Sequence, residues 1–123
     1  FKTTNIVTNG VIGHVRYSTY SVSKKNKEIQ LKESQPFLGN RKWIDFSLCF
    51  NGNIPNAKQL VEKYMDNECW HEIGNDTEFL VKMVERENKL KIENALIDML
   101  SEIHGAYCIL ILTDIGVYAM RDT

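Results

Sequence analysis

Three short polar segments of the sequence carry side chains that could bind and activate an amino-acid substrate. Arg16-Tyr17-Ser18-Thr19 follows an apolar run, and its guanidinium group offers the paired donors that suit a carboxylate. Asn51-Gly52-Asn53 could direct an amide and a backbone N–H at a developing oxyanion. Asp76-Thr77-Glu78 contains a carboxylate that could hold an ammonium group. A substrate with an α-carboxylate, an α-amine and a reacting side-chain carbonyl would use all three segments, and glutamine is such a molecule.

Each of these segments also has an ordinary structural interpretation. Arg16 could form a surface salt bridge at the end of a strand. Asn51-Gly52 is a common pair in hairpin turns, although the residues after it are expected to form a helix and not a second strand. Asp76 could cap a helix and interact favourably with its dipole. The three segments also lack a nucleophile.

Apolar periodicity predicts the elements that would position these segments. Three amphipathic helices are expected, at residues 56–65, 77–86 and 92–103. Four apolar segments are expected to be strands, at residues 11–17, 43–50, 106–112 and 116–120. The last two strands should form an antiparallel hairpin. Because helices and antiparallel strands occur in separate blocks, we expect an α+β domain with the first two helices on one sheet face.

Polar and glycine residues mark where these elements should begin and end. Asn56 is expected to cap the first helix, and Asn75 or Asp76 the second. Gly105 is expected to stop the third helix. Residues 35–38 should be extended, because a proline disfavours the helical region for the residue before it.

The composition argues against several classes of function. The 123 residues suit a single domain. The 15 basic and 16 acidic residues give a net charge of -1, whereas nucleic-acid-binding proteins usually have a basic excess. No apolar run approaches the roughly 20 residues of a membrane-spanning helix. The three cysteines lack CxxC spacing, so no metal site is predicted. Cys49 and Cys108 are expected to be buried, in a protein of the reducing cytoplasm.

The polar motifs, taken in order, resemble those of a class II glutamine amidotransferase domain. The matching segments are Gly13-His14-Val15-Arg16-Tyr17-Ser18-Thr19, Gln35-Pro36-Phe37, Asn51-Gly52-Asn53, Asp76-Thr77-Glu78, Gly105-Ala106-Tyr107 and Arg121-Asp122. Within the family, the Arg-Tyr-Ser-Thr form most resembles amidophosphoribosyltransferases. Family members that make glucosamine 6-phosphate usually carry Trp-Ala-Thr after the arginine, and asparagine synthetases differ around the arginine.

The resemblance implies a fold and a set of roles for the motif residues. The fold would be the N-terminal-nucleophile type, a four-layer αββα sandwich with mainly antiparallel sheets. Arg16 and Thr19 would hold the glutamine carboxylate, and Asp76 its α-amine. Asn51 and Gly52 would stabilise the tetrahedral oxyanion.

The same resemblance implies a loop from Tyr17 to about Ser23, including Ser18, that closes over bound glutamine. Two residues depart from the pattern of amidophosphoribosyltransferases, in which histidine is usual at the position of Phe50 and serine at that of Asn75.

The nucleophile of this family is a cysteine at the mature N-terminus, whose own α-amine handles the proton. Residue 1 here is Phe1. We therefore expect residues 1–123 to be a type 2 amidotransferase domain that is incomplete at both ends and inactive alone. Cys49, which should point to the same strand face as Asn51, is the one internal thiol worth testing.

The expected function is the glutaminase portion of a glutamine-dependent amidotransferase, which releases ammonia for transfer to phosphoribosyl diphosphate in purine synthesis. The alternatives are another acceptor, such as fructose 6-phosphate or aspartate, or a non-catalytic glutamine-binding module. No cofactor is expected in this domain, and Mg²⁺ only in a phosphoribosyltransferase domain of the same protein. The expected partners are L-glutamine, the acceptor-synthase domain and further copies in a homo-oligomer, without nucleic acid or membrane.

Overall fold

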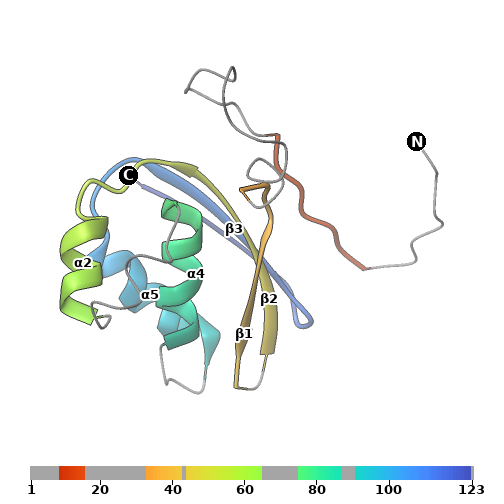
Figure 1. Ribbon diagram of the computed structural model, residues 1–123. Helices are drawn as coiled ribbons and strands as arrows, with labels where there is room; N and C mark the ends of the chain where they lie inside the picture. Colours follow the sequence, from red (N-terminus) through yellow and green to blue (C-terminus); the bar gives the residue numbers. More distant parts are fainter. Residues whose placement is uncertain (1–8, 16–32, 43, 65–74, 87–90, 123) are drawn as a thin grey trace.

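The computed structural model describes residues 9–15, 33–42, 44–64, 75–86 and 91–122. These residues form an antiparallel sheet with helices packed on one of its faces (Figure 1). The strands are β1 (Phe37–Arg41), β2 (Ile44–Gly52), β3 (Tyr107–Thr113) and β4 (Val117–Arg121). The helices are α2 (Ala57–Tyr64), α4 (Asp76–Arg86) and α5 (Ile92–Glu102). The part of the chain that is described is therefore a mixed α+β arrangement, as the sequence predicts.

The strands follow one another across the sheet in the order β1-β2-β3-β4, and every neighbouring pair is antiparallel. β2 is the longest strand and runs past the end of β1. Its pairing with β1 stops at Phe37 opposite Leu48, whereas its pairing with β3 continues to Gly52 opposite Tyr107. Among the described strands, only β3 therefore pairs with the last residues of β2.

The helices cover the sheet face to which alternate residues of β2 and β3 point. α4 packs on β1 and β2, and α2 and α5 pack against α4. The core between the two layers contains large apolar side chains from all of these elements, among them Leu48, Phe79, Leu80, Ile109 and Ile111. This packing confirms the prediction that the first two helices lie together on one face.

The opposite sheet face carries apolar side chains that none of the described helices covers, although Gly10 lies near Leu112 and Val117. Leu38 on β1 is 81% exposed and Val117 on β4 is 53% exposed. Leu112 lies opposite Val117 in the strand register and is half-buried, as is Leu110. We refer to this surface, made by Leu38, Leu110, Leu112 and Val117, as the open sheet face.

The hairpin of β3 and β4 and the three helices agree with the sequence predictions to within two residues where their ends are described. Two strand predictions need correction. Residues 11–15 were expected to be extended within a strand, but they belong to no strand, and residues 16 and 17 lie outside the described part. Residues 37–41, by contrast, form β1 and pair with β2, although only an extended segment was expected there.

Two smaller predictions also need correction. Asn56 is at the N-cap position of α2, and its backbone O accepts from Leu60 N at 3.1 Å. Its side chain, however, donates to Glu102 O (2.9 Å) and accepts from His104 N (2.9 Å). It therefore ties the start of α2 to the end of α5. Cys108 is exposed and not buried, although Cys49, on the same sheet face, is buried as predicted.

Among the described residues, no helix has both the length and the apolar character needed to cross a membrane.

Candidate functional site

The candidate site is built around residues 51–54, where β2 leaves the sheet and leads into α2. Asn51, Gly52 and Asn53 are all exposed. The backbone N–H of Asn53 donates to Ala106 O at 3.0 Å. The next N–H, that of Ile54, donates to Asp76 Oδ2 at 3.1 Å. Two segments that are distant in the sequence therefore hold the end of this segment in place.

The bond from Ile54 brings together two groups that the sequence analysis had singled out separately. Asp76 is the first residue of α4, and its carboxylate reaches the backbone three residues beyond Asn51. The side chain of Asp76 is half-buried. The predicted oxyanion segment and the predicted amine-binding carboxylate are thus neighbours in the fold.

Asn75 explains why the Asp76 carboxylate is available for this contact. The Glu78 N–H donates to Asn75 Oδ1 at 3.0 Å, which is the bond that a helix N-cap residue makes. The sequence left open which of the two residues caps α4, and the structure assigns the capping bond to Asn75. Asp76 instead makes its bond outside the helix.

Two glycines allow the backbones of residues 52–53 and 105–106 to lie in direct contact. Gly52 has φ of +153° and Gly105 has φ of +120°. A Cβ at Gly52 would overlap with Ala106 O, and a Cβ at Gly105 would overlap with Asn53 O. α5 already ends at Glu102, so Gly105 serves this close approach and does not itself terminate the helix as expected.

Gln35 makes a contact with β2 that sequence reasoning did not find. Its Oε1 accepts from Phe50 N at 2.6 Å, and its Nε2 donates to Phe50 O at 2.9 Å. The motif Gln35-Pro36-Phe37 supported the family resemblance, but nothing in the sequence links it to a residue fifteen positions away. Its side chain contacts the residue immediately before Asn51.

The two described cysteines near Asn51 differ in exposure. Cys49 is buried, with 3% of its surface exposed, and this burial raises the pKa of its thiol. A raised pKa disfavours the reactive thiolate, so the structure argues against Cys49 as a nucleophile. Cys108 is exposed and lies opposite Asn51 in the register of β2 and β3.

The remaining predicted site residues lie outside the described part of the chain. They are Arg16, Tyr17, Ser18 and Thr19, so their predicted contacts with a substrate stay predictions. Among the described residues, no group of three or more histidine, cysteine, aspartate or glutamate side chains could hold a metal ion.

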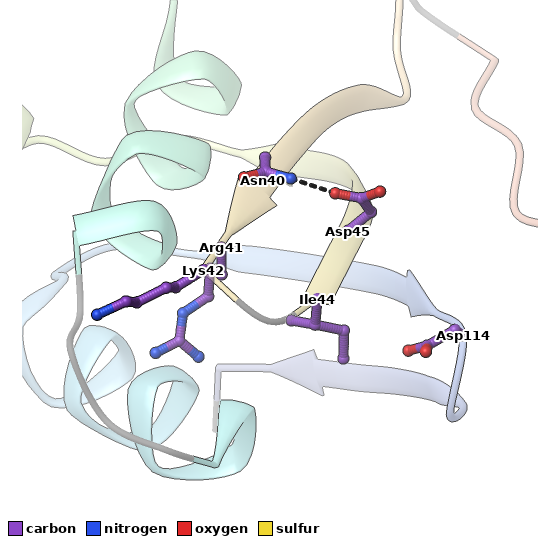
Figure 2. Close-up of a pocket in the computed structure, with 6 residues that line it drawn as sticks. All are labelled: Asn40, Arg41, Lys42, Ile44, Asp45 and Asp114. Atoms are coloured by element: carbon purple, nitrogen blue, oxygen red, sulfur yellow. Dashed lines mark hydrogen bonds between the residues drawn. The ribbon is translucent and has the colours of Figure 1, made fainter.

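A polar cleft of about 370 Å³ lies at the other end of β2, away from Asn51. It is lined by Asn40, Arg41, Lys42, Ile44, Asp45 and Asp114. Figure 2 shows Arg41 and Lys42 extending to one side, with Asp114 on the turn between β3 and β4 at the other. Asn40 Nδ2 donates to Asp45 Oδ1 across the hairpin. Of the predicted site residues that are described, namely Asn51, Gly52 and Asp76, none lines this cleft.

Comparison with known proteins identifies the family to which this arrangement belongs. Residues 22–123 match the model of a glutamine amidotransferase domain. The chain therefore belongs to the glutamine amidotransferase family, and the resemblance seen in its motifs places it in class II.

Within this family the chain is similar to amidophosphoribosyltransferases. It is 33% identical to the amidophosphoribosyltransferase of Staphylococcus epidermidis, over 90% of this chain and 21% of that protein. It is 30% identical to the chloroplastic amidophosphoribosyltransferase 3 of Arabidopsis thaliana, over 98% of this chain and 22% of that protein. The chain thus spans about a fifth of the length of these curated relatives.

Solved structures show the same similarity. The glutamine phosphoribosylpyrophosphate amidotransferase from B. subtilis, complexed with ADP and GMP, matches 89% of this chain with a TM-score of 0.67 and 28% identity. The match covers 22% of that structure. A second structure, of an allosteric regulatory enzyme of purine biosynthesis, matches 72% of the chain with a TM-score of 0.60.

Proposed function

We propose that the chain is the glutamine-binding and glutaminase portion of a glutamine-dependent amidotransferase. The observation that carries this proposal is the bond from Ile54 N to Asp76 Oδ2. It joins an exposed Asn-Gly pair to a carboxylate at the start of a helix. An amino acid bound across this junction would place its ammonium group near the carboxylate and its reacting carbonyl near Asn51.

Asp76 has the capacity to bind an α-amine in addition to its backbone contact. An ionised carboxylate has about four lone-pair sites on its two oxygens. The bond from Ile54 N uses one of them on Oδ2. An ammonium group would gain a charge-assisted hydrogen bond at the remaining sites.

Asn51 and Gly52 are the proposed oxyanion donors. Attack on the side-chain amide of glutamine develops negative charge on the carbonyl oxygen. Donors that are already fixed in place stabilise this charge without reorganisation during the reaction. The contacts at Asn53 and Ile54 hold the backbone immediately after these two residues, which supports this role.

The proposed reaction also needs groups beyond those that the structure describes. We assign the glutamine carboxylate to Arg16 and Thr19, with a closing loop that runs from Tyr17 to about Ser23 and includes Ser18. The nucleophile in this proposal is an N-terminal cysteine of the complete protein. Its thiolate attacks the side-chain carbonyl of glutamine, ammonia leaves, and water hydrolyses the acyl intermediate to glutamate.

The open sheet face supports the four-layer architecture that the family resemblance implies. Leu38 and Val117 expose apolar surface on the side of the sheet away from the helices. In an αββα sandwich a second sheet of the same domain would cover this surface, and the side chains of the two sheets would interdigitate.

Phosphoribosyl diphosphate is the proposed acceptor of the ammonia. This part of the proposal rests on the similarity to amidophosphoribosyltransferases. Because the chain spans only about a fifth of those proteins, the acceptor site and any Mg²⁺ would lie in the rest of the protein, as would contacts between subunits.

The test is the substitution Asp76→Asn in the complete protein that carries this domain. An asparagine can still accept from Ile54 N but has no charge to offer an ammonium group. We expect kcat/KM for glutamine to fall by about 10- to 150-fold, the equivalent of one charge-assisted hydrogen bond. Synthesis with free ammonia in place of glutamine should continue at the normal rate.

Asp45→Asn is the matched control, because Asp45 lies on the same strand as Asn51 but at the opposite end. It should leave both activities unchanged. Normal use of glutamine by the Asp76→Asn protein would rule out the proposed amine site.

A further inference from the structure

We propose that Gln35 is a positioning residue that fixes the orientation of Asn51. This inference rests on the proposed function, in which Asn51 is an oxyanion donor. It starts from the pair of hydrogen bonds between the Gln35 side chain and the backbone of Phe50.

The contact completes the pairing of β2 where β1 is missing. The register of β1 and β2 runs from Arg41 opposite Ile44 to Phe37 opposite Leu48. In an antiparallel sheet, the N–H and C=O of every second residue point to the same neighbouring strand. If β1 continued, its backbone would therefore bond the N–H and C=O of Phe50. The Gln35 side chain supplies both bonds, accepting from the N–H and donating to the carbonyl. A primary amide can do this because it carries a donor and an acceptor side by side.

The bond to the Phe50 carbonyl reaches Asn51 through the peptide between them. The carbonyl of Phe50 and the N–H of Asn51 belong to one planar unit. A bond that fixes the direction of that carbonyl therefore also fixes the direction in which the backbone enters Asn51. On its other side, Asn51 is paired with Cys108 of β3. Gln35 thus holds the peptide between Phe50 and Asn51 on the side of β2 where the pairing with β1 has stopped.

The Asn51-Gly52 pair is held from both directions along the chain. Gln35 holds the peptide that precedes it, and the bonds of Asn53 and Ile54 hold the segment that follows. Loss of the preceding contact would let Asn51 depart from the position at which it meets an oxyanion. Small displacements of a catalytic group lower the rate steeply, and about 1 Å can cost roughly 100-fold.

The experiment measures glutamine hydrolysis by the complete protein with the substitution Gln35→Met, which keeps the shape of the side chain but makes neither bond. We expect kcat to fall by about 10- to 100-fold, with KM for glutamine and the ammonia-dependent rate unchanged. Gln59→Met, at an exposed position of α2, is the matched control and should behave as the unsubstituted protein.

A double variant separates positioning from a general structural effect. If Gln35 acts through Asn51, then Gln35→Met combined with Asn51→Ala should be no slower than Asn51→Ala alone. A double variant in which the two losses multiply would overturn the inference. So would a normal kcat for Gln35→Met in a protein that Asn51→Ala impairs. A normal rate for Asn51→Ala itself would overturn the oxyanion assignment and this inference together.

A second variant keeps the test decisive if Gln35→Met does not fold. Gln35→Glu retains the acceptor for Phe50 N but, when ionised, places a negative oxygen against the Phe50 carbonyl. Protonation restores a donor, so its rate relative to the unsubstituted protein should rise as the pH falls. A ratio that stays constant with pH would contradict the positioning role.

Discussion

The two ends of β2 hold their polar groups in different ways. At the end that contains Asn51, the contacts are made to backbone groups by partners from three separate segments, namely Gln35, Asp76 and Ala106. At the other end, polar side chains surround an open cleft, and Asn40 bonds Asp45 across the hairpin. The first end offers the proposed donors of Asn51 and Gly52 beside the Asp76 carboxylate. The second offers space and several charges of both signs.

This difference shows that a cleft lined by charges and a site prepared for catalysis need not coincide. Exposed ion pairs and side-chain contacts are screened by water and cost side-chain entropy to order. The proposed Gly52 donor belongs to a backbone that the contacts of Asn53 and Ile54 hold, so it loses little freedom when a substrate binds and keeps its direction as charge develops. On this physical ground we place the candidate site at the Asn51 end, although the described cleft of about 370 Å³ lies at the other.

The sharpest test of the comparison uses one asparagine at each end. Asn51→Ala should lower the glutaminase rate of the complete protein by about 10²–10³, because one oxyanion donor is lost. Asn40→Ala removes a similar exposed side chain beside the cleft and should leave that rate unchanged. Steady-state assays of glutamate release would measure both. The reverse result, with Asn40 critical and Asn51 dispensable, would move the site to the cleft.

A second test concerns the close backbone contact at the Asn51 end. Gly52→Ala adds a Cβ that overlaps with Ala106 O at a positive φ. We expect the free energy of unfolding to fall by about 2–3 kcal/mol, from backbone strain and overpacking. Urea titration followed by circular dichroism would measure the change.

Gly116→Ala is the control for this substitution, because a Cβ at Gly116 meets nothing within 4 Å. It should change stability by no more than about 0.5 kcal/mol. Equal stabilities for the two alanine variants would show that the contact between residues 52 and 106 is not close.

The sequence predicted the helices and the β3-β4 hairpin well, but it predicted a strand at residues 11–15 that does not form and missed β1. The apolar residues of α4 and α5 recur at helical spacing because they all face one core. This pattern lies within a short stretch of sequence and is therefore easy to recognise. Residues 11–15 are apolar enough to suggest a strand, yet Val11 and Val15 are mostly exposed and unpaired with the sheet. The sequence of β1, Phe-Leu-Gly-Asn-Arg, shows little alternation of apolar and polar residues. This strand forms because it pairs with β2, and a local sequence pattern does not report such pairing.

Some features of the candidate site could likewise be predicted from the sequence, and others could not. The family resemblance indicated that Asn51 and Asp76 belong to one site, and the structure brings their segments together. The bonds of Gln35 to Phe50 could not be predicted, because they depend on β1 beginning only at Phe37. The exposure of Cys108 could not be predicted either, because Cys49 lies on the same sheet face within a similar apolar run and is buried.

A third prediction concerns the cleft end alone. Asp45 is exposed and faces Asn40 across the hairpin. Asp45→Ala should lower the free energy of unfolding by no more than about 1 kcal/mol, as is usual for exposed polar pairs. The measurement is the same urea titration. A loss as large as that expected for Gly52→Ala would mean that the cleft end is as firmly held as the Asn51 end.

The smallest expected effect lies away from both ends, on the helices. Glu102 accepts from Tyr64 Oη at 2.7 Å and from Lys63 Nζ at 2.9 Å. The Tyr64 hydrogen bond, followed by that of Lys63, lowers the pKa of Glu102 below its ordinary value of 4.5. Because the folded state then binds its proton less readily than the unfolded chain, this contribution to stability is complete above about pH 4.5. It is lost as the pH falls through the folded pKa.

Glu102→Gln should therefore flatten the decline in stability on the acid side of that value, and Tyr64→Phe should flatten it in part. Both changes should be small, since the groups are solvent-accessible and screened by water. Urea titrations at several acidic pH values would measure them, with glutaminase activity of the complete protein as a second readout. Activity should not change in either variant, because the Glu102 carboxylate bonds Lys63 and Tyr64 of α2 and none of the predicted site residues that the structure describes. A loss of glutaminase activity in Glu102→Gln at neutral pH, with stability intact, would show that the site extends to this helical surface and does not end at residues 51–54 and Asp76.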